Sequence, residues 1–182
     1  LNAYKMEADD AQGVSDILFK TVQRGKTTFS QLGAALPRVT SMAAAMDIQF
    51  EQIAGAMATM TKQGMPTTEA VTQLRAVVMS LNEALGDGWQ KNMSLQEGML
   101  KVKEAADGSQ NKLRELLGRE EAVNAVLSMT GKSAETAAKD LEAMKDATGA
   151  ATTAFDRMKG STENQLAKPA IIPVCGPSIR IL

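Results

Sequence analysis

Few residues in this 182-residue chain have the types and spacing that chemistry requires. Histidine is absent and Cys175 is the single cysteine, so the sequence offers neither a His/Cys metal site nor histidine-based acid–base catalysis. Cys175 also stands in a proline-rich stretch, and without a histidine to activate it we interpret it as an inert thiol and not a nucleophile. A lone cysteine forms no internal disulfide.

Two pairs of adjacent acidic residues are the other candidates for chemistry. Asp9/Asp10 and Glu120/Glu121 resemble acid–base partners, but neighbouring residues on a helix point about 100° apart. Acidic side chains are favourable at the start of a helix, so we interpret both pairs as solvated helix starts. No glycine follows a strand to form a phosphate-binding loop. We therefore expect no catalytic site, no metal and no cofactor, and predict that the chain is not an enzyme.

The composition predicts an all-α fold. Apolar residues make up 44% of the chain but aromatic residues only 3%, and strand-type alternation appears nowhere over a useful length. Glycines and prolines interrupt the sequence at short intervals, and Thr28, Ser94 and Ser109 precede apolar periodic stretches as helix N-caps do. These patterns predict a multi-helix module of short helices and helical hairpins with negligible sheet.

The charge distribution argues against two classes of partner. The formal net charge is −1 and the charged residues are scattered, so neither nucleic acid nor an anionic membrane surface is indicated as a partner. No run approaches the roughly 20 apolar residues that a membrane-spanning helix needs.

The most strongly patterned stretch, Phe50 to Leu85, predicts a helical hairpin. Gly64 is placed to end the first helix in a left-handed conformation. Asp47 and the hydroxyl of Thr67 are the expected N-caps of the two helices. Residues at three- and four-residue steps give each helix an apolar stripe. The stripes are Ile53, Met57 and Met60 in the first helix, and Val71, Leu74, Val78 and Leu81 in the second.

The composition changes abruptly near the C-terminus. Three of the five prolines fall between Pro169 and Pro177, so we place the end of the helical module (residues 1–168) at Lys168. Residues 169–182 are then a non-helical, proline-rich tail, which we interpret as a product of cloning or of an altered reading frame in preference to a functional tail. The chain also lacks an initial Met, which predicts that it is a piece of a longer protein.

Two groups of side chains leave alternatives open. The twelve methionines could form an adaptable partner-binding groove, although filling a core poor in aromatic residues is the simpler interpretation. Thr72 and Arg75, on the second helix of the hairpin, could contact a partner or an anion, or could belong to a solvated face. The residues alone define no active site.

The hairpin resembles the core region of phage or prophage tail tape measure proteins. Those proteins commonly carry alternate alanines before a Thr-x-x-Gly step, then a short turn and a Glu-Ala-x-Thr-x-Leu-Arg run. Residues 117–122 and 149–156 resemble later segments of the same family, so the likeness covers about Val14 to Ala167. The residues of this chain that carry the motif are Gly64, Met65, Glu69, Ala70, Thr72, Leu74 and Arg75.

This resemblance implies a structural virion protein without catalytic activity. Such proteins occupy the lumen of the phage tail tube, set tube length during assembly and leave ahead of the genome at infection. The implied partners are tail tube proteins, tail-tip or baseplate proteins and tail assembly chaperones, and the full-length protein is expected to be a homo-oligomer made in the bacterial host cytoplasm. The motif residues would be structural or would contact a partner.

Two other classes of protein remain as alternatives. A helical adaptor or interaction module would show similar hairpins, but no fixed repeat period is visible. A coiled-coil signalling protein would need sustained heptads, which Gly64, Pro66 and Gly86 interrupt. The same interruptions predict that this piece is a folded module and not the measuring rod itself.

Replacement of Leu74 by Asp tests the predicted apolar stripe of the second helix. Burial of an unpaired carboxylate should cost about 4 kcal/mol or more and unfold the module. We expect Leu74→Asp to abolish the cooperative thermal transition measured by circular dichroism. A midpoint within about one degree of the wild-type value would refute the placement of Leu74 in the core.

Overall fold

The structure of the chain is a computed structural model that describes Tyr4 and residues 10–166, with side chains described as far as residue 159. Ten α-helices and the 3-10 helix η3 lie in this part of the chain, and none of the described residues forms a strand. The all-α prediction is confirmed. The elements are α1 Ala11–Arg24, α2 Phe29–Ala35, α3 Pro37–Ala45, α4 Phe50–Lys62, α5 Thr67–Leu85, η3 Trp89–Lys91, α6 Leu95–Ala105, α7 Gln110–Leu117, α8 Glu120–Met129, α9 Ala134–Lys145 and α10 Ala150–Leu166.

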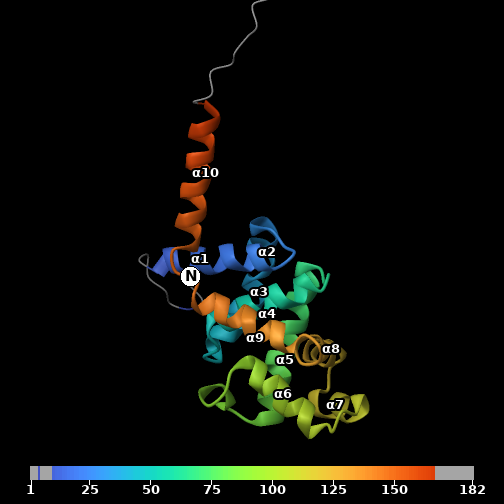
Figure 1. Ribbon diagram of the computed structural model, residues 1–182. Coiled ribbons are helices and arrows are strands. Elements are labelled where there is room, and N and C mark those ends of the chain that lie inside the picture. The colour runs from blue at the N-terminus through green and yellow to red at the C-terminus, as the bar shows by residue number, and fades with distance from the viewer. Residues whose placement is uncertain (1–3, 5–9, 167–182) are drawn as a thin grey trace, which may run out of the picture. The chain divides into compact units, whose positions relative to one another are not determined.

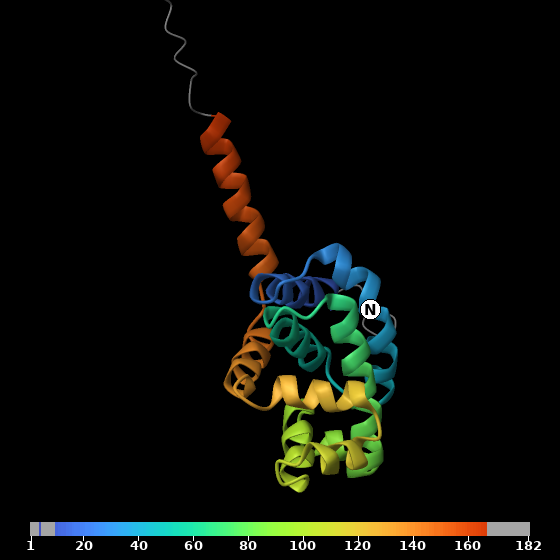
Figure 2. The ribbon, with the colours of Figure 1, turned by 90° about the vertical axis from the view of Figure 1, so that its right-hand side faces the viewer.

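The chain divides into two compact units, residues 1–151 and 152–182. The first unit contains α1 to α9 and the start of α10, and the described part of the second is the rest of α10. Within the first unit, α1 and α2 lie at one end and α6 and α7 at the other (Figures 1 and 2). Among the described residues, no helix is both long and apolar enough to cross a membrane.

Helix α4 is the centre of the first unit. Every residue from Ile53 to Thr61 is buried, and the helix contacts α1, α3, α5, α8 and α9 (Figure 1). A helix buried on all faces needs apolar or small residues all round, which the alanines and methionines of this stretch supply. Full burial of a side chain such as Ile53 or Met57 stabilises the fold by about 1.5–3 kcal/mol.

Helices α4 and α5 form the predicted hairpin. Gly64 has φ +97°, which favours glycine, and the Met65 N–H donates to the Met60 carbonyl at 3.3 Å to close the end of α4. All seven residues of the two predicted apolar stripes are buried. Besides α4, α5 contacts α2, α3, α6, α7 and α8, so the hairpin provides most of the core.

The methionines act mainly as core filling. Met57 and Met60 are fully buried, while Met42, Met46 and Met65 are partly buried against the core. This arrangement matches the simpler of the two interpretations, in which Met replaces missing aromatic residues.

Local capping was predicted correctly at three helix starts. The hydroxyls of Thr28, Ser94 and Ser109 each accept a hydrogen bond from the backbone N–H three residues later. The backbone N–H of Thr28 donates in return to Gln31 Oε1, and that of Ser94 to Glu97 Oε2, so each of these two starts has a complete capping box. The same contacts to Ser94 hold the pKa of the Glu97 carboxyl below its usual value.

Two other predicted caps were wrong. Asp47 adopts a left-handed conformation with φ 53° in the turn before α4, whose N-cap is Gln49 without a side-chain hydrogen bond. Thr67 is the first residue of α5, and its hydroxyl lies 2.7 Å from the hydroxyl of Thr27 instead of capping the helix. This tertiary partner, 40 residues away, cannot be read from the local sequence. The boundary predicted at Lys168 lies outside the described residues.

Helix α9 crosses α4 at Gly55. A Cβ atom at this position would lie 3.1 Å from the Leu141 Cα and 3.2 Å from the Leu141 N. These are backbone atoms, so they cannot rotate away as a flexible side chain could. Glycine at position 55 therefore permits the close approach of the two helices.

The substitution Gly55→Ala tests this close approach. Overpacking at a helix crossing typically costs about 1–3 kcal/mol, and we expect a lower melting temperature even though Ala is the better helix former. The matched control is Gly13→Ala in α1, where a Cβ would meet nothing within 4 Å. The control should raise stability or leave it unchanged. An equal rise in melting temperature for both variants would contradict the tight crossing.

Candidate functional site

The motif residues of the hairpin divide into an inward and an outward group. Ala70 and Leu74 are fully buried, and Met65 is partly buried against the core. Gly64 forms the turn between α4 and α5. These four residues therefore shape the hairpin and its packing, and none is positioned to meet a partner through a polar group.

The outward group, Glu69, Thr72 and Arg75, is exposed and forms what we call the outer face of α5. Glu69 accepts a hydrogen bond from Gln73 Nε2 at 3.1 Å, and the Thr72 hydroxyl donates to the Thr68 carbonyl at 3.0 Å. Arg75 makes no ion pair with any described residue. The fold thus needs little from Thr72 and Arg75, whereas Glu69 is a hydrogen-bond partner of the buried Gln73 side chain.

A groove of about 430 Å³ opens beside the turn of the hairpin. Its lining comes from α2 and Lys26 before it, the end of α4, the turn after α4 and the start of α5. The lining residues are Lys26, Ser30, Gln31, Ala34, Thr61, Gly64, Met65, Pro66, Thr67 and Thr68. Hydroxyls and one amine line the groove, but no carboxylate or imidazole is present to act as a base, so it offers no nucleophile–base pair.

A buried carboxylate joins three helices of the first unit. Asp140 of α9 is fully buried and accepts hydrogen bonds from Thr59 Oγ1 at 2.8 Å and from Arg24 Nε at 2.5 Å. Lys62 Nζ lies 2.9 Å and 3.0 Å from its two oxygens. We call these four residues the Asp140 cluster. All the donors come from α1 and α4, so the cluster ties α9 to both.

The sequence interpretation did not identify the Asp140 cluster, although a signal was present. Asp140 follows Ala137 by three residues and precedes Met144 by four, so it lies on the apolar stripe of α9. An acidic residue on a buried stripe needs a partner, because unpaired buried charges are rarely tolerated. The helices that supply the partners are determined by the tertiary structure, so a local sequence pattern does not identify them.

A second buried carboxylate, Asp16 of α1, acts as a cap. It accepts hydrogen bonds from the backbone N–H groups of Gly149 at 2.7 Å and Ala151 at 2.8 Å. These groups flank the start of α10, where a negative charge is favourable. Asp16 is therefore occupied by a structural role.

The structure describes three of the four residues in the acidic pairs singled out in the sequence. Glu120 is exposed at the start of α8 and accepts from Arg114 Nε at 2.8 Å and Nη2 at 3.2 Å, which holds the pKa of its carboxyl below the usual value. Glu121 is exposed as well. Asp9 and Cys175 lie outside the described residues. Within the described residues, no group of three or more His, Cys, Asp or Glu side chains could hold a metal ion.

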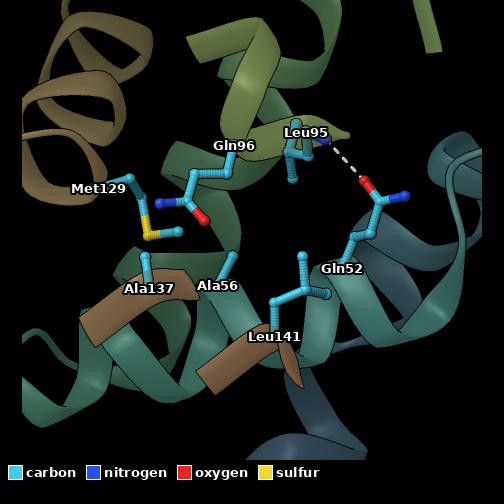
Figure 3. Close-up of a pocket in the computed structure, with 7 residues that line it drawn as sticks. All are labelled: Gln52, Ala56, Leu95, Gln96, Met129, Ala137 and Leu141. Carbon is cyan, nitrogen blue, oxygen red and sulfur yellow. Dashed lines mark hydrogen bonds between the residues drawn. The ribbon is translucent and has the colours of Figure 1, made fainter. Parts of the chain in front are cut away.

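A small cavity of about 10 Å³ lies where α4, α6, α8 and α9 meet (Figure 3). Its lining includes Ala56, Met129 and Leu141, and two glutamine side chains join helices at its edge. Gln52 Oε1 accepts from the Leu95 N–H at 2.6 Å, drawn as the dashed line in Figure 3. The space is too small for a ligand and is a packing defect between helices.

Comparison with known proteins assigns the family. Residues 1–170 match the family described as phage-related minor tail proteins. The chain therefore belongs to this family, whose members are structural proteins of the phage tail. The resemblance of the hairpin to tail tape measure proteins had predicted a phage tail protein, and the family match confirms this. No solved structure matches the chain.

One relative has a more specific description than the family does. A protein described as a probable tape measure protein, from Clostridium phage phiCD119, is 30% identical over 187 residues. The match covers 91% of this chain and 20% of that protein. The chain thus spans about a fifth of the length of this relative.

The double substitution Thr72→Ala/Arg75→Ala tests whether the outer face of α5 is independent of the fold. Exposed substitutions away from special features usually change stability by less than about 0.5 kcal/mol. We expect the helical signal and the melting temperature of the double variant to match the wild type in a circular dichroism melt. A loss of several degrees would show that these side chains support the fold.

Proposed function

We propose that the chain is a folded segment of a tail tape measure protein, which occupies the lumen of the tail tube, sets tube length during assembly and leaves ahead of the genome. The observation that carries this proposal is the 30% identity to a probable tape measure protein along 91% of the chain. Membership of the minor tail protein family supports the same assignment. The proposal gives the chain a structural and not a catalytic role.

In this proposal, the part of the protein that sets the length of the tail lies outside the first unit. A continuous helix advances about 1.5 Å per residue and can act as a ruler for the tube that polymerises around it. The helices of the first unit have 7 to 19 residues and pack back on one another around α4. The first unit therefore acts as a compact module within a longer protein.

The outer face of α5 is the proposed contact with another tail component. Glu69, Thr72 and Arg75 combine an acidic, a hydroxyl and a basic side chain on one helix, and Arg75 makes no ion pair among the described residues. Candidate partners are tail tube proteins, tail-tip or baseplate proteins and tail assembly chaperones, with further copies of the full-length protein. In the phage, the Thr72→Ala/Arg75→Ala double variant should reduce the yield of complete tails.

An insertion experiment tests the tape measure role directly. In the phage that encodes this chain, a 40-residue uninterrupted helical segment is inserted after Leu166, and tail length is measured by electron microscopy. If the protein sets length as a helical ruler, tails should lengthen by about 60 Å.

The matched control places the same insert in the exposed turn at Asp107 and Gly108, between α6 and α7 of the compact module. This insert should leave tail length unchanged, because the ends of the turn stay together. Tails of wild-type length from the insert after Leu166, with normal yield, would contradict length determination by this protein.

A further inference from the structure

Helix α9 buries fewer apolar side chains than the neighbouring helix α8, although it packs extensively against α4. Its buried residues are Ala137, Asp140 and Met144, so Met144 is the single large apolar side chain that it buries fully. Helix α8 buries Ala122, Val123, Ala125, Val126 and Met129. Because stabilisation by apolar burial scales with buried area, α9 gains less from it than α8 does.

The packing beneath α9 is also uneven. The helix touches α4 closely at Gly55, but beside this crossing Ala137 and Leu141 line the small cavity shown in Figure 3. Leu141 itself is only partly buried. Side chains that line a cavity lose the dispersion contacts that close packing would supply.

Polar contacts make up much of what holds α9. At its start, Gln96 Nε2 donates to the Ala134 carbonyl at 2.8 Å, and near its end the Thr21 hydroxyl lies 3.6 Å from Met144 Sδ. In the middle, the Asp140 carboxylate meets Thr59 and the two cations of the Asp140 cluster. The side chains of Arg24 and Lys62 are 33% and 36% exposed, so water reaches these cations if the carboxylate leaves.

We infer that α9 opens as a separate local unit while α4, α5 and α8 stay folded, and that the Asp140 cluster controls this opening. The fully buried Asp140 carboxylate keeps α9 closed, because its departure breaks hydrogen bonds to two cations and one hydroxyl at once. The partly exposed Arg24 and Lys62 become hydrated on opening, which keeps the open state accessible. This inference does not depend on the proposed function.

Opening would uncover a defined part of α4. Gly55, Ala56 and Thr59 lie beneath α9 or line the cavity beside it, whereas the contacts of α5 with α8 involve other residues. The first unit would thus have two levels of stability, a core held by α4, α5 and α8 and the helix α9, which is released first.

Hydrogen–deuterium exchange followed by mass spectrometry on the 182-residue chain tests the inference. The variant Asp140→Asn keeps the size of the side chain and an acceptor for Thr59 but removes the charge. Loss of charged hydrogen bonds should raise exchange of the α9 amides by roughly ten- to hundredfold, with α5 and α8 amides nearly unchanged. Unchanged exchange in α9, or an equal rise in α5, α8 and α9, would overturn the inference.

The matched control removes an exposed ion pair from the same helix. Lys139 Nζ lies 2.5 Å from Glu135 Oε1, and both side chains are mostly exposed. The variant Lys139→Gln should leave exchange in α9 within about threefold of the wild type, because exposed pairs contribute little. A rise as large as that of Asp140→Asn would show that any charge removed from α9 has the same effect, and would overturn the role of the Asp140 cluster.

The wild-type protein supplies a test that does not depend on how any variant folds. In native conditions, amides of Ala134–Lys145 should exchange faster than the helical amides of α5 and α8 and should respond less to low denaturant, as local opening does. Equal protection in all three helices, with equal denaturant dependence, would mean that they open only together and would overturn the inference.

Discussion

The burial of α4 on every face is the constraint on which the rest of the first unit depends. A helix with no solvent face must be surrounded, so segments distant in sequence have to meet around it, and α1, α3, α5, α8 and α9 do so. The same constraint explains why a glycine stands where α9 crosses it. It also explains why the buried threonines of α4 are paired, Thr61 with the Met57 carbonyl and Thr59 with Asp140.

Two buried aspartates connect the N-terminal helix to the C-terminal part of this arrangement. Asp140 of α9 meets Arg24 of α1 across 116 residues of sequence, and Asp16 of α1 meets the Gly149 N–H across 133 residues. Loss of one partner from a buried charge cluster is costly, because the remaining charges are left uncompensated, so these contacts specify which helices lie together. We regard them as the contacts that fix α1 against the end of the first unit.

The sequence predicted the parts of this fold that depend on short-range patterns. The hairpin of α4 and α5, its stop at Gly64 and the caps at Thr28, Ser94 and Ser109 follow from residues within one or two helical turns. The sequence did not predict that Thr67 bonds to Thr27, because that partner comes from another element.

The candidate site was predictable only in part for the same reason. The apolar spacing of the second hairpin helix correctly placed Leu74 in the core, but Thr72 and Arg75 could be assigned to the exposed face only with α5 in place. The Asp140 cluster could not be predicted from the sequence, because its donors are on two other helices. An acidic residue on the stripe of α9 was the one available signal.

The central claim is that this segment of a phage minor tail protein is a compact helical module closed around α4, and not a stretch of extended rod. Small-angle X-ray scattering on residues 1–151, the first unit, tests the claim most directly. A compact domain of this size should give a radius of gyration of about 15 Å. A value of about 40 Å or more, as expected for an unfolded chain or for one continuous helix about 230 Å long, would contradict it.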